Sequence, residues 1–542
     1  MEVDPRYEVM NQSNLPVAKS RYLTNSFART YVTSKGVDEA SLKSYGEFLG
    51  TQEADERARE ENDNSPILKS YNRIGERVDE ISFHPSYHYF MEMATKSGVA
   101  SFPNEKGRGH LERALKLHML SEVEPGHGCP ISMTYAAVAT LKEVTVDETS
   151  YLADLIEKLR RCSYDPREIP ISQKESITSG MGMTERQGGS DVRANVTQAT
   201  KISGDRYRIT GHKWFMSAPQ SDLFLITAKA ERGVSCFALP RRREDGSLNS
   251  IQIQRLKRKI GNQSNASSEV IFDGSEATLV GEEGRGVSTI IKMVSHCRLD
   301  SLIGSAGEIR SATVDAIDHA RARRVFGKLL IDAELMVNVL GDLVIESIAA
   351  TITSLRLAYC DDTAPFNEAD GALRRIGVPL SKFLVCKRAP TLIAEAIECL
   401  GGNGYVEESR GALLFRESPL NGMWEGSGNV NALDLIRVIT RDRSAIEALF
   451  YYLDRNSIDD THLSRMILEC KTMVARDEIP EAKGRVLATR LAKALQMSIL
   501  IESGFNDVAI EYLKARIRPR QDSDVIGTIE VGEGLRSLID SF

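Results

Sequence analysis

The sequence predicts an α+β fold in which helical and β-rich segments follow one another along the chain. Apolar residues recur at helical spacing from Tyr87 to Leu159 and again from Ser288 to Ile439. Between these stretches, from about Ile177 to Leu279, the pattern changes to short β-like runs punctuated by Gly and Asp turns. We therefore expect a helical domain, a β domain and then a bundle of long helices.

Individual elements can be placed within this order. The β segment contains five strand-like runs, which are Tyr207–Thr210, Leu223–Ala228, Val234–Leu239, Ile251–Gln254 and Glu269–Phe272. Beyond residue 442 the apolar spacing is again helical, over Ile446–Leu453, Leu463–Val474 and Arg485–Ile501.

Five segments result. We expect an N-terminal extension at 1–80, a helical domain at 81–176, a middle β domain at 177–284, a C-terminal helical bundle domain at 285–442 and an additional helical domain at 443–542. The extension is polar, with a charged stretch Glu53–Glu61 and then Asn62–Pro66, whose composition predicts a loop.

Composition places the chain among soluble globular proteins. It has 542 residues, 42% of them hydrophobic and 27% charged, and a net charge of −7. This balance gives no general attraction to nucleic acid or anionic membranes. No apolar run looks long enough to span a bilayer, and the start of the chain lacks a signal-peptide or mitochondrial-leader pattern. A cytoplasmic location is expected, or a mitochondrial one if a leader has been removed.

The eight cysteines are scattered and include no C-x-x-C pair. They suggest neither a metal site nor a disulfide framework, and most are expected to be small buried side chains.

A single carboxylate stands out in Trp424-Glu425-Gly426-Ser427-Gly428-Asn429. An aromatic neighbour and two glycines allow such a carboxylate to be desolvated and closely approached, which suits removal of a proton from carbon. Taken alone, Glu425 is better explained as an acid at a helix N-terminus.

Other motifs change that balance. Met181–Asp191 reads Met-Gly-Met-Thr-Glu-Arg-Gln-Gly-Gly-Ser-Asp, and Gly211–Ser217 reads Gly-His-Lys-Trp-Phe-Met-Ser. Further motifs, in order, are Lys259–Ser268, Gly281–Gly286, Arg323–Lys328 and the stretch from Leu400 to Arg437. In this order and spacing, the motifs resemble those of the acyl-CoA dehydrogenase family. The residues within them are similar to the AidB-like branch of that family. The resemblance runs from about Phe83 to about Arg437.

The resemblance implies an acyl-CoA dehydrogenase fold: an N-terminal helical domain, a middle β-barrel domain and a C-terminal four-helix domain, here with an extra helical C-terminal extension. It also implies an FAD-dependent enzyme in which a base removes the α-proton of an acyl-CoA thioester while a β-hydride passes to flavin N5. By resemblance Glu425 is that base. The alternative family position for the base, before Arg298-Leu299, is occupied by Cys297.

Part of the flavin site is implied in the first two motifs. Thr184 and Met183 match residues near the ring, Ser190 matches a residue that reaches pyrophosphate and substrate, and Trp214 matches an aromatic residue against the ring. Gly189 would allow close approach of the backbone to phosphate. Met216 and Ser217 lie beside this aromatic in the motif.

The other part of the cofactor site is implied to come from a neighbouring subunit. The matching residues are Arg323, Phe326, Glu398, Gly401, Gly402, Ser427 and Asn429. Arg323 could equally lie on a solvated helix face, and Glu398 departs from the usual glutamine, which puts a contact with phosphate in doubt. No Rossmann fingerprint is present, so NAD is not expected.

For the substrate, the resemblance implies a fatty acyl-CoA of medium to long chain. Arg298 matches a residue that meets the CoA nucleotide, although an ion pair with Asp300 or with a neighbouring helix is an equal alternative. His127 and His296 are more simply interpreted as structural residues. A homotetramer built as a dimer of dimers is expected, and electron-transfer flavoprotein is a candidate partner.

Two other functions stay open. One is a flavoprotein that sequesters fatty acyl-CoA and regulates lipid metabolism with little turnover. The other is a DNA-associated flavoprotein of the alkylation response. Residues 441–542 hold 15 Lys/Arg and 17 Asp/Glu, which disfavours DNA binding. The exception is a short basic cluster, which could be a binding patch or a solvated helix end: Lys514, Arg516, Arg518 and Arg520.

Overall fold

The computed structural model describes residues 10–12, 19–103, 109–145, 147, 150–476, 479–519, 524–529 and 532–542. It divides into two compact units, one made of 56–113 and 124–300 and the other of 1–55, 114–123 and 301–542. We call the first the barrel unit and the second the bundle unit. The chain passes between them within helix α3 (Gln52–Asp63), within α5 (His110–Ser121), after residue 123 and within α8 (Gly286–Ala322).

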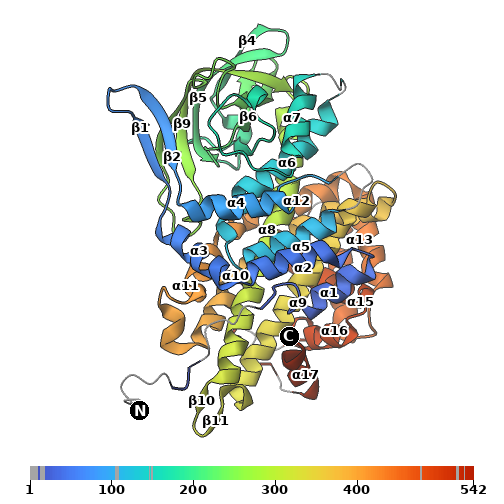
Figure 1. Ribbon diagram of the computed structural model, residues 1–542. Helices are drawn as coiled ribbons and strands as arrows, with labels where there is room; N and C mark the ends of the chain where they lie inside the picture. The colour runs from blue at the N-terminus through green and yellow to red at the C-terminus, as the bar shows by residue number, and fades with distance from the viewer. Residues whose placement is uncertain are drawn as a thin grey trace, which may run out of the picture. The chain divides into compact units, whose positions relative to one another are not determined.

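Among the described residues, every strand longer than two residues lies in the barrel unit (Figure 1). Its strands are β1 (Ile67–Tyr71), β2 (Arg77–Ser82), β3 (Ser179–Gly182), β4 (Gln198–Ser203), β5 (Arg206–Ser217), β6 (Leu223–Ala230), β7 (Gly233–Pro240), β8 (Ile251–Leu256) and β9 (Ser267–Val280). Helices α4 (Pro85–Lys96), α6 (Gly128–Val144) and α7 (Tyr151–Leu159) belong to it entirely. Each of the five predicted β runs lies inside one of β5 to β9.

The sheet closes into a barrel because its pairings form a ring. In order around the ring, β5 pairs with β4, β4 with β6, β6 with β7, β7 with β9, and β9 with β5. Its interior is filled by apolar side chains at alternate positions, including Tyr207, Ile209, Phe224, Phe237 and Phe272. The predicted middle β domain is therefore confirmed.

The N-terminal extension is more regular than its polarity predicts. Helix α3 spans Gln52–Asp63, so the loop expected over Asn62–Pro66 begins only after Asp63. The next residues form the β1–β2 hairpin, which the sequence analysis did not predict. Tertiary hydrogen bonds stabilise it: Arg77 donates to the carbonyl of Ile253 at 2.6 Å, and the Ile253 N–H donates to Asp79 at 3.0 Å.

The bundle unit is helical. Wholly within it lie α1 (Ser26–Ser34), α2 (Glu39–Leu49), α9 (Glu334–Thr363), α10 (Glu368–Glu398), α11 (Arg410–Glu417), α12 (Gly428–Arg441), α13 (Arg443–Arg455), α14 (Thr461–Val474), α15 (Gly484–Glu502), α16 (Asn506–Tyr512) and α17 (Glu533–Ser541). The shared helices are α3, α5 (His110–Ser121) and α8 (Gly286–Ala322). A short hairpin, β10 (Arg324–Val325) and β11 (Lys328–Leu329), follows α8.

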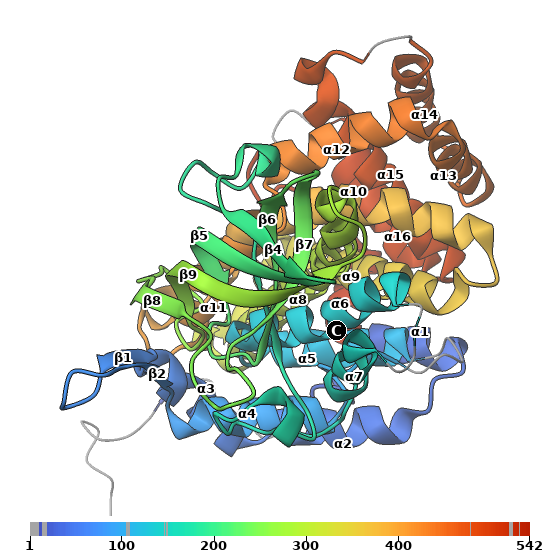
Figure 2. The same ribbon diagram turned by 90° about the horizontal axis from the view of Figure 1, so that it is seen from above.

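Helix α10 lies at the centre of this unit. It packs against α9, α12, α13 and α15, and α14 packs on α15, as the neighbouring helices in Figure 2 show. The helices predicted beyond residue 442 are present. Because α13 and α15 pack on α10, the C-terminal extension and the bundle share one compact unit; the predicted domain boundaries themselves stay predictions.

Helix α9 corrects one expectation about membranes. Among the described residues it alone is long and apolar enough to cross a bilayer by length and composition, whereas the sequence analysis expected no such run. Most of its apolar window, 78%, is buried inside the protein. Its hydrophobicity is therefore accounted for by its position among the other helices of the bundle unit.

The basic cluster near residue 516 is engaged in ion pairs. The buried Arg516 guanidinium contacts the carboxylates of Asp342 and Glu346, and both acids raise its pKa further although burial alone would lower it. Lys514 pairs with Glu511 at 2.8 Å, and Arg518 pairs with Asp460 at 3.0 Å; Arg520 lies outside the described residues. These contacts argue against a free basic surface at the described positions.

Replacing Arg516 by methionine should reduce the free energy of unfolding by about 3–5 kcal/mol, because the buried Asp342 would lose its ion-pair partner and Glu346 would keep only Arg388. Chemical denaturation monitored by circular dichroism measures this. Lys514→Met is the matched control, since its side chain is half exposed and its loss should cost less than about 0.5 kcal/mol. Equal small effects of both substitutions would contradict the structural role of Arg516.

Candidate active site

The residues predicted for the site fall into two groups. Met183, Thr184, Gly189, Ser190, Trp214, Met216, Ser217 and Arg298 belong to the barrel unit. Arg323, Phe326, Glu398, Gly401, Gly402, Glu425, Ser427 and Asn429 belong to the bundle unit. Each group is described within its own unit.

A buried ion pair joins the first two sequence motifs inside the barrel. The Lys213 ammonium lies 2.8 Å from Glu185, and both side chains are fully buried. Burial lowers the pKa of Lys213 to about 8, while Lys213 lowers the pKa of Glu185 despite burial of that carboxyl. Lys213 also donates to the Thr227 carbonyl at 2.7 Å. Glu185 and Lys213 therefore fix the relative positions of the two motifs.

Thr184, the residue before Glu185, is held by a backbone hydrogen bond to the second motif. Its carbonyl accepts the Trp214 N–H at 2.8 Å, which pairs the two motifs through the backbone. A Cβ at Gly189 would lie 2.5 Å from the Thr184 hydroxyl, so this position needs glycine if Thr184 is to keep its place. Gly189 and Ser190 are both exposed. The Met183 carbonyl already accepts from Asn195 at 2.8 Å.

The aromatic residues of the second motif differ in exposure, although the Lys257 ammonium lies over both rings and is 4.5 Å from the centroid of Phe215. Trp214 is half-buried, and the Lys257 ammonium lies 3.6 Å from its ring centroid. The next residue, Phe215, is 46% exposed, whereas Met216 is fully buried. A bulge between Lys213 and Met216 interrupts the simple alternation of side chains along β5. Phe215 is therefore the more accessible ring for a flat ligand, which the sequence analysis did not predict.

Glu425 lies on a tightly held loop of the bundle unit. Its backbone has φ +55, a left-handed conformation that costs a non-glycine residue about 1–3 kcal/mol and often marks a functional position. The Lys382 ammonium, on α10, accepts no hydrogen bonds and donates to the carbonyls of Asn421, Trp424 and Gly426 at 2.9, 2.9 and 3.1 Å. The carboxylate is half-buried.

A second buried carboxyl supports this loop. Asn421 donates to Glu308 at 3.0 Å and accepts from the Trp424 indole N–H at 2.9 Å. Burial, with the neighbouring Glu417, raises the pKa of Glu308 well above its ordinary value. Burial therefore favours the protonated form of Glu308, which carries no negative charge beneath the loop.

The Arg323 segment ends in a short exposed hairpin. Phe326 and Gly327 connect β10 to β11, and both have positive φ, as a two-residue hairpin turn requires. Phe326 is fully exposed. The Arg323 guanidinium donates to the Asn11 carbonyl at 2.6 Å, which uses one of its five N–H groups.

The remaining residues of the bundle unit lie at helix ends. Gly401 begins a short 3₁₀ turn, Gly401–Tyr405, with φ +62, and a Cβ on Gly401 or Gly402 would meet no atom within 4 Å. Glu398 is exposed at the end of α10, and its charge adds to the burial that raises the pKa of Glu395. Ser427 precedes α12, and the Asn429 side chain accepts from Arg485 at 3.4 Å.

One alternative for Arg298 is removed by the geometry. Asp300, the partner considered for it, instead forms a two-point contact with the Arg113 guanidinium at 2.5 and 2.7 Å, and Arg298 itself is buried. Cys297 is also buried, with its thiol against the Ser132 carbonyl.

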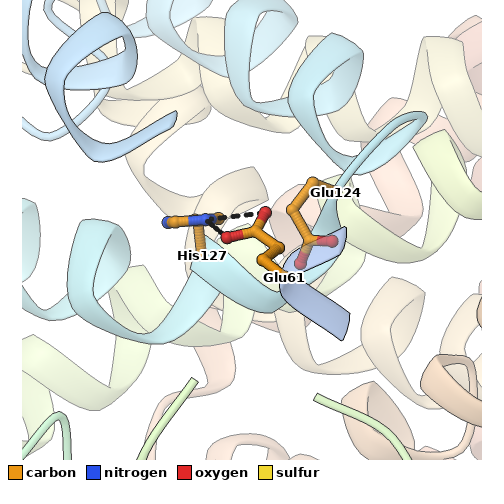
Figure 3. A group of neighbouring side chains, drawn as sticks. All are labelled: Glu61, Glu124 and His127. Atoms are coloured by element: carbon orange, nitrogen blue, oxygen red, sulfur yellow. Dashed lines mark hydrogen bonds and ion pairs between the residues drawn. The ribbon is translucent and has the colours of Figure 1, made fainter. Parts of the chain in front are cut away.

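His127 belongs to a buried group with Glu61 and Glu124 (Figure 3). One ring nitrogen lies 3.1–3.2 Å from both oxygens of Glu61. Burial lowers the pKa of His127 to about 4, which keeps the ring neutral, and burial also raises the pKa of Glu61. Glu124 accepts hydrogen bonds from Asn62, the Gly126 N–H and Ser264. These hydrogen bonds tie the loop after β8 to the segment before α6, which is a structural role.

Sequence reasoning missed Lys382, Glu308 and Phe215. Lys382 and Glu308 lie far from Glu425 in the chain and sit in apolar helical patterns that carry no local signal. A charged residue on the buried face of such a pattern would have been the available clue. Phe215 stands inside a quoted motif, and its exposure could not be read without the bulge in β5.

Replacing Glu308 by glutamine should raise stability increasingly as the pH rises. The folded pKa of Glu308 exceeds its unfolded value, so the stability from its protonated form is complete below the unfolded pKa and is lost as pH rises through the folded pKa. Glutamine does not ionise and can still accept from Asn421. Thermal unfolding should show equal Tm values near pH 4 and a higher Tm for the variant at pH 8; a pH-independent difference would contradict this.

Three family models match the chain in order. They describe the AidB N-terminal domain over residues 11–166, the acyl-CoA dehydrogenase middle domain over 180–275 and the acyl-CoA dehydrogenase C-terminal domain over 284–440.

Individual relatives agree with these models. AidB of Escherichia coli is 40% identical over 446 residues, which cover 81% of this chain and 80% of that protein. Acyl-CoA dehydrogenase family member 11 of Caenorhabditis elegans is 30% identical over 499 residues, covering 88% and 78%. The crystal structure of C. elegans ACDH-11 in complex with C11-CoA superposes with a TM-score of 0.84 at 24% identity and covers 95% of both chains. The chain thus belongs to the acyl-CoA dehydrogenase family, in its AidB-like branch.

Proposed function

We propose that this protein is an FAD-dependent acyl-CoA dehydrogenase that acts on medium- to long-chain fatty acyl-CoA, with Glu425 as the base. The observation that carries the proposal is the held conformation of Glu425: a left-handed backbone on a loop whose carbonyls converge on the buried Lys382 ammonium. Family membership supports the reaction class, and the complex of ACDH-11 with C11-CoA supports the substrate class.

The residues of the barrel unit fit a flavin. Phe215 offers an exposed aromatic face, and exposed Gly189 and Ser190 lie next to Thr184, where backbone and hydroxyl groups can meet a polar ring edge or a phosphate. Thr184 is fixed to Trp214 through its carbonyl and to Gly189 by packing. When bound, FAD would supply the acceptor for the β-hydride.

The chemistry assigned to this chain is proton transfer. The α-proton of a thioester is weakly acidic, so its removal needs an ionised carboxylate held at the correct place. Glu425 would accept this proton and become a neutral carboxylic acid. The fixed carbonyls on either side of Glu425 restrict the carboxylate before substrate arrives, which lowers the cost of orientation.

We also propose the homotetramer, built as a dimer of dimers, as the working assembly. Phe326 is fully exposed at the tip of its hairpin, and Tyr405 and Met423 are 88% and 60% exposed in the same unit. A subunit interface that covered these side chains would remove their apolar surface from water. Electron-transfer flavoprotein remains the proposed electron acceptor.

Anaerobic titration of the purified protein with C8 to C16 acyl-CoAs tests the function. We expect the visible flavin band to bleach with a preference for chain length, and Glu425→Gln to bind acyl-CoA but bleach at least 10³-fold more slowly, an order-of-magnitude figure for loss of a general base. Saturable binding without bleaching in the wild type would instead support the sequestering function. A protein without flavin would overturn the cofactor assignment.

Gly189→Ala should weaken FAD retention roughly 10-fold, equivalent to about 1.4 kcal/mol, because the new Cβ displaces Thr184. The ratio of flavin to protein absorbance, followed during dilution, measures this. Gly371→Ala in α10 is the control, since its Cβ would meet only ordinary contact at 3.8 Å from Ala364. Equal flavin content in both variants would remove Gly189 from the cofactor site.

A further inference from the structure

The loop that carries Glu425 needs a source of rigidity. A non-glycine residue with φ +55 persists only where its surroundings over-determine the backbone. Glycines at positions 422, 426 and 428 surround it, and Gly426 also has a positive φ of 105°. Glycine gives the unfolded and locally opened chain many alternative conformations. The local sequence alone therefore does not hold Glu425 in place.

Lys382 supplies the missing constraint. Its side chain is 1% exposed, and its ammonium reaches three backbone carbonyls of the loop at 2.9–3.1 Å. Two of them belong to Trp424 and Gly426, the residues immediately before and after Glu425. The Trp424 carbonyl belongs to the peptide plane that leads into Glu425, and the Gly426 carbonyl belongs to the plane one residue beyond it, so the two contacts hold the chain before and after Glu425.

The chemistry of the contact requires lysine. An ammonium has three N–H donors on one atom, which matches three converging carbonyl oxygens. Methionine has a similar length and no donor, and the planar guanidinium of arginine distributes its donors over a wide fork. A charge buried this deeply is costly unless its donors are satisfied, so the carbonyls and the ammonium depend on one another.

Two neighbouring contacts reinforce the same loop. Asn431, in α12, donates to the carbonyls of Gly426 and Ser427 at 2.7 and 3.0 Å. Asn421 links Glu308 to the Trp424 indole. These contacts involve side-chain amides at the ends of the loop, whereas Lys382 alone bridges its beginning, middle and end in the described part of the chain.

We propose that Lys382 is a positioning residue for the catalytic base: its ammonium holds the carbonyls on both sides of Glu425 and thereby sets the place of the carboxylate. This inference rests on the proposed role of Glu425. The structural clamp itself is a separate claim and has a separate measurement.

The experiment compares flavin-loaded Lys382→Met with wild type in two ways. Hydrogen–deuterium exchange should become at least 10-fold faster at the amides of residues 423–427, because the loop opens more often. The rate of anaerobic bleaching by acyl-CoA should fall about 100-fold, the effect of misplacing a catalytic group by about 1 Å. Flavin content and the dissociation constant for acyl-CoA should change less than about threefold, because the Lys382 side chain is buried and its ammonium donates to loop carbonyls.

Arg356→Met provides a matched control for loss of a buried cation. Arg356 lies on α9 and pairs with Asp370 and Glu502 at 2.6 and 2.7 Å. Its replacement should lower Tm but leave loop exchange and the bleaching rate unchanged. If Lys382→Met does not fold while Arg356→Met does, Lys382→Gln is measured instead; glutamine keeps two N–H donors and should give an intermediate rise in exchange.

The outcomes separate the clamp from the function. Wild-type exchange at 423–427 in the Lys382 variant would overturn the clamp. Faster exchange with an unchanged bleaching rate would overturn its positioning role. If the wild type does not bleach at all, the dehydrogenase function fails, while the exchange measurement still decides whether Lys382 holds the loop.

Discussion

The ion pair between Glu185 and Lys213 is the contact on which the barrel side of the site depends. Each residue belongs to a sequence motif that also contains exposed groups. The buried ion pair holds the two motifs together, so that their exposed groups lie on one fixed surface. Removing one partner of such a pair leaves an uncompensated buried charge, which typically costs about 3–5 kcal/mol. Glu185 is held further by backbone N–H groups of Val196 and Thr197. Thr184 and Phe215 therefore project from a fixed scaffold.

The part of the site in the bundle unit also depends on a buried lysine with satisfied hydrogen-bond donors. There the buried cation is Lys382, and its partners are backbone carbonyls rather than a carboxylate. Burial raises the pKa of Glu308 and so favours its neutral form. In both arrangements, buried polar groups fix the orientation of neighbouring residues. The low dielectric of the interior strengthens these hydrogen bonds and ion pairs. A catalytic base on a glycine-rich loop can then be both accessible and ordered.

The ion pairs of the C-terminal extension bear on the choice among functions. Arg516 and Arg518 had suggested a basic patch for DNA, yet their guanidinium groups are occupied by acids of the same unit. Packing of α13 and α15 on α10 also gives the extension a role in supporting the helix that carries Lys382. The acyl-CoA function therefore accounts for more of the described residues than the DNA-associated one.

The sequence by itself determined the family, the order of helical and β segments and the position of the base candidate, because motifs and apolar periodicity are local properties. It missed the β1–β2 hairpin, whose short strands depend on contacts with Ile253. It also named Trp214 where the bulge in β5 leaves Phe215 the more accessible ring. Only the tertiary structure could decide that Lys382 holds the carbonyls around Glu425. Hydrogen bonds between residues 39 to 44 positions apart produce no periodic pattern in the sequence.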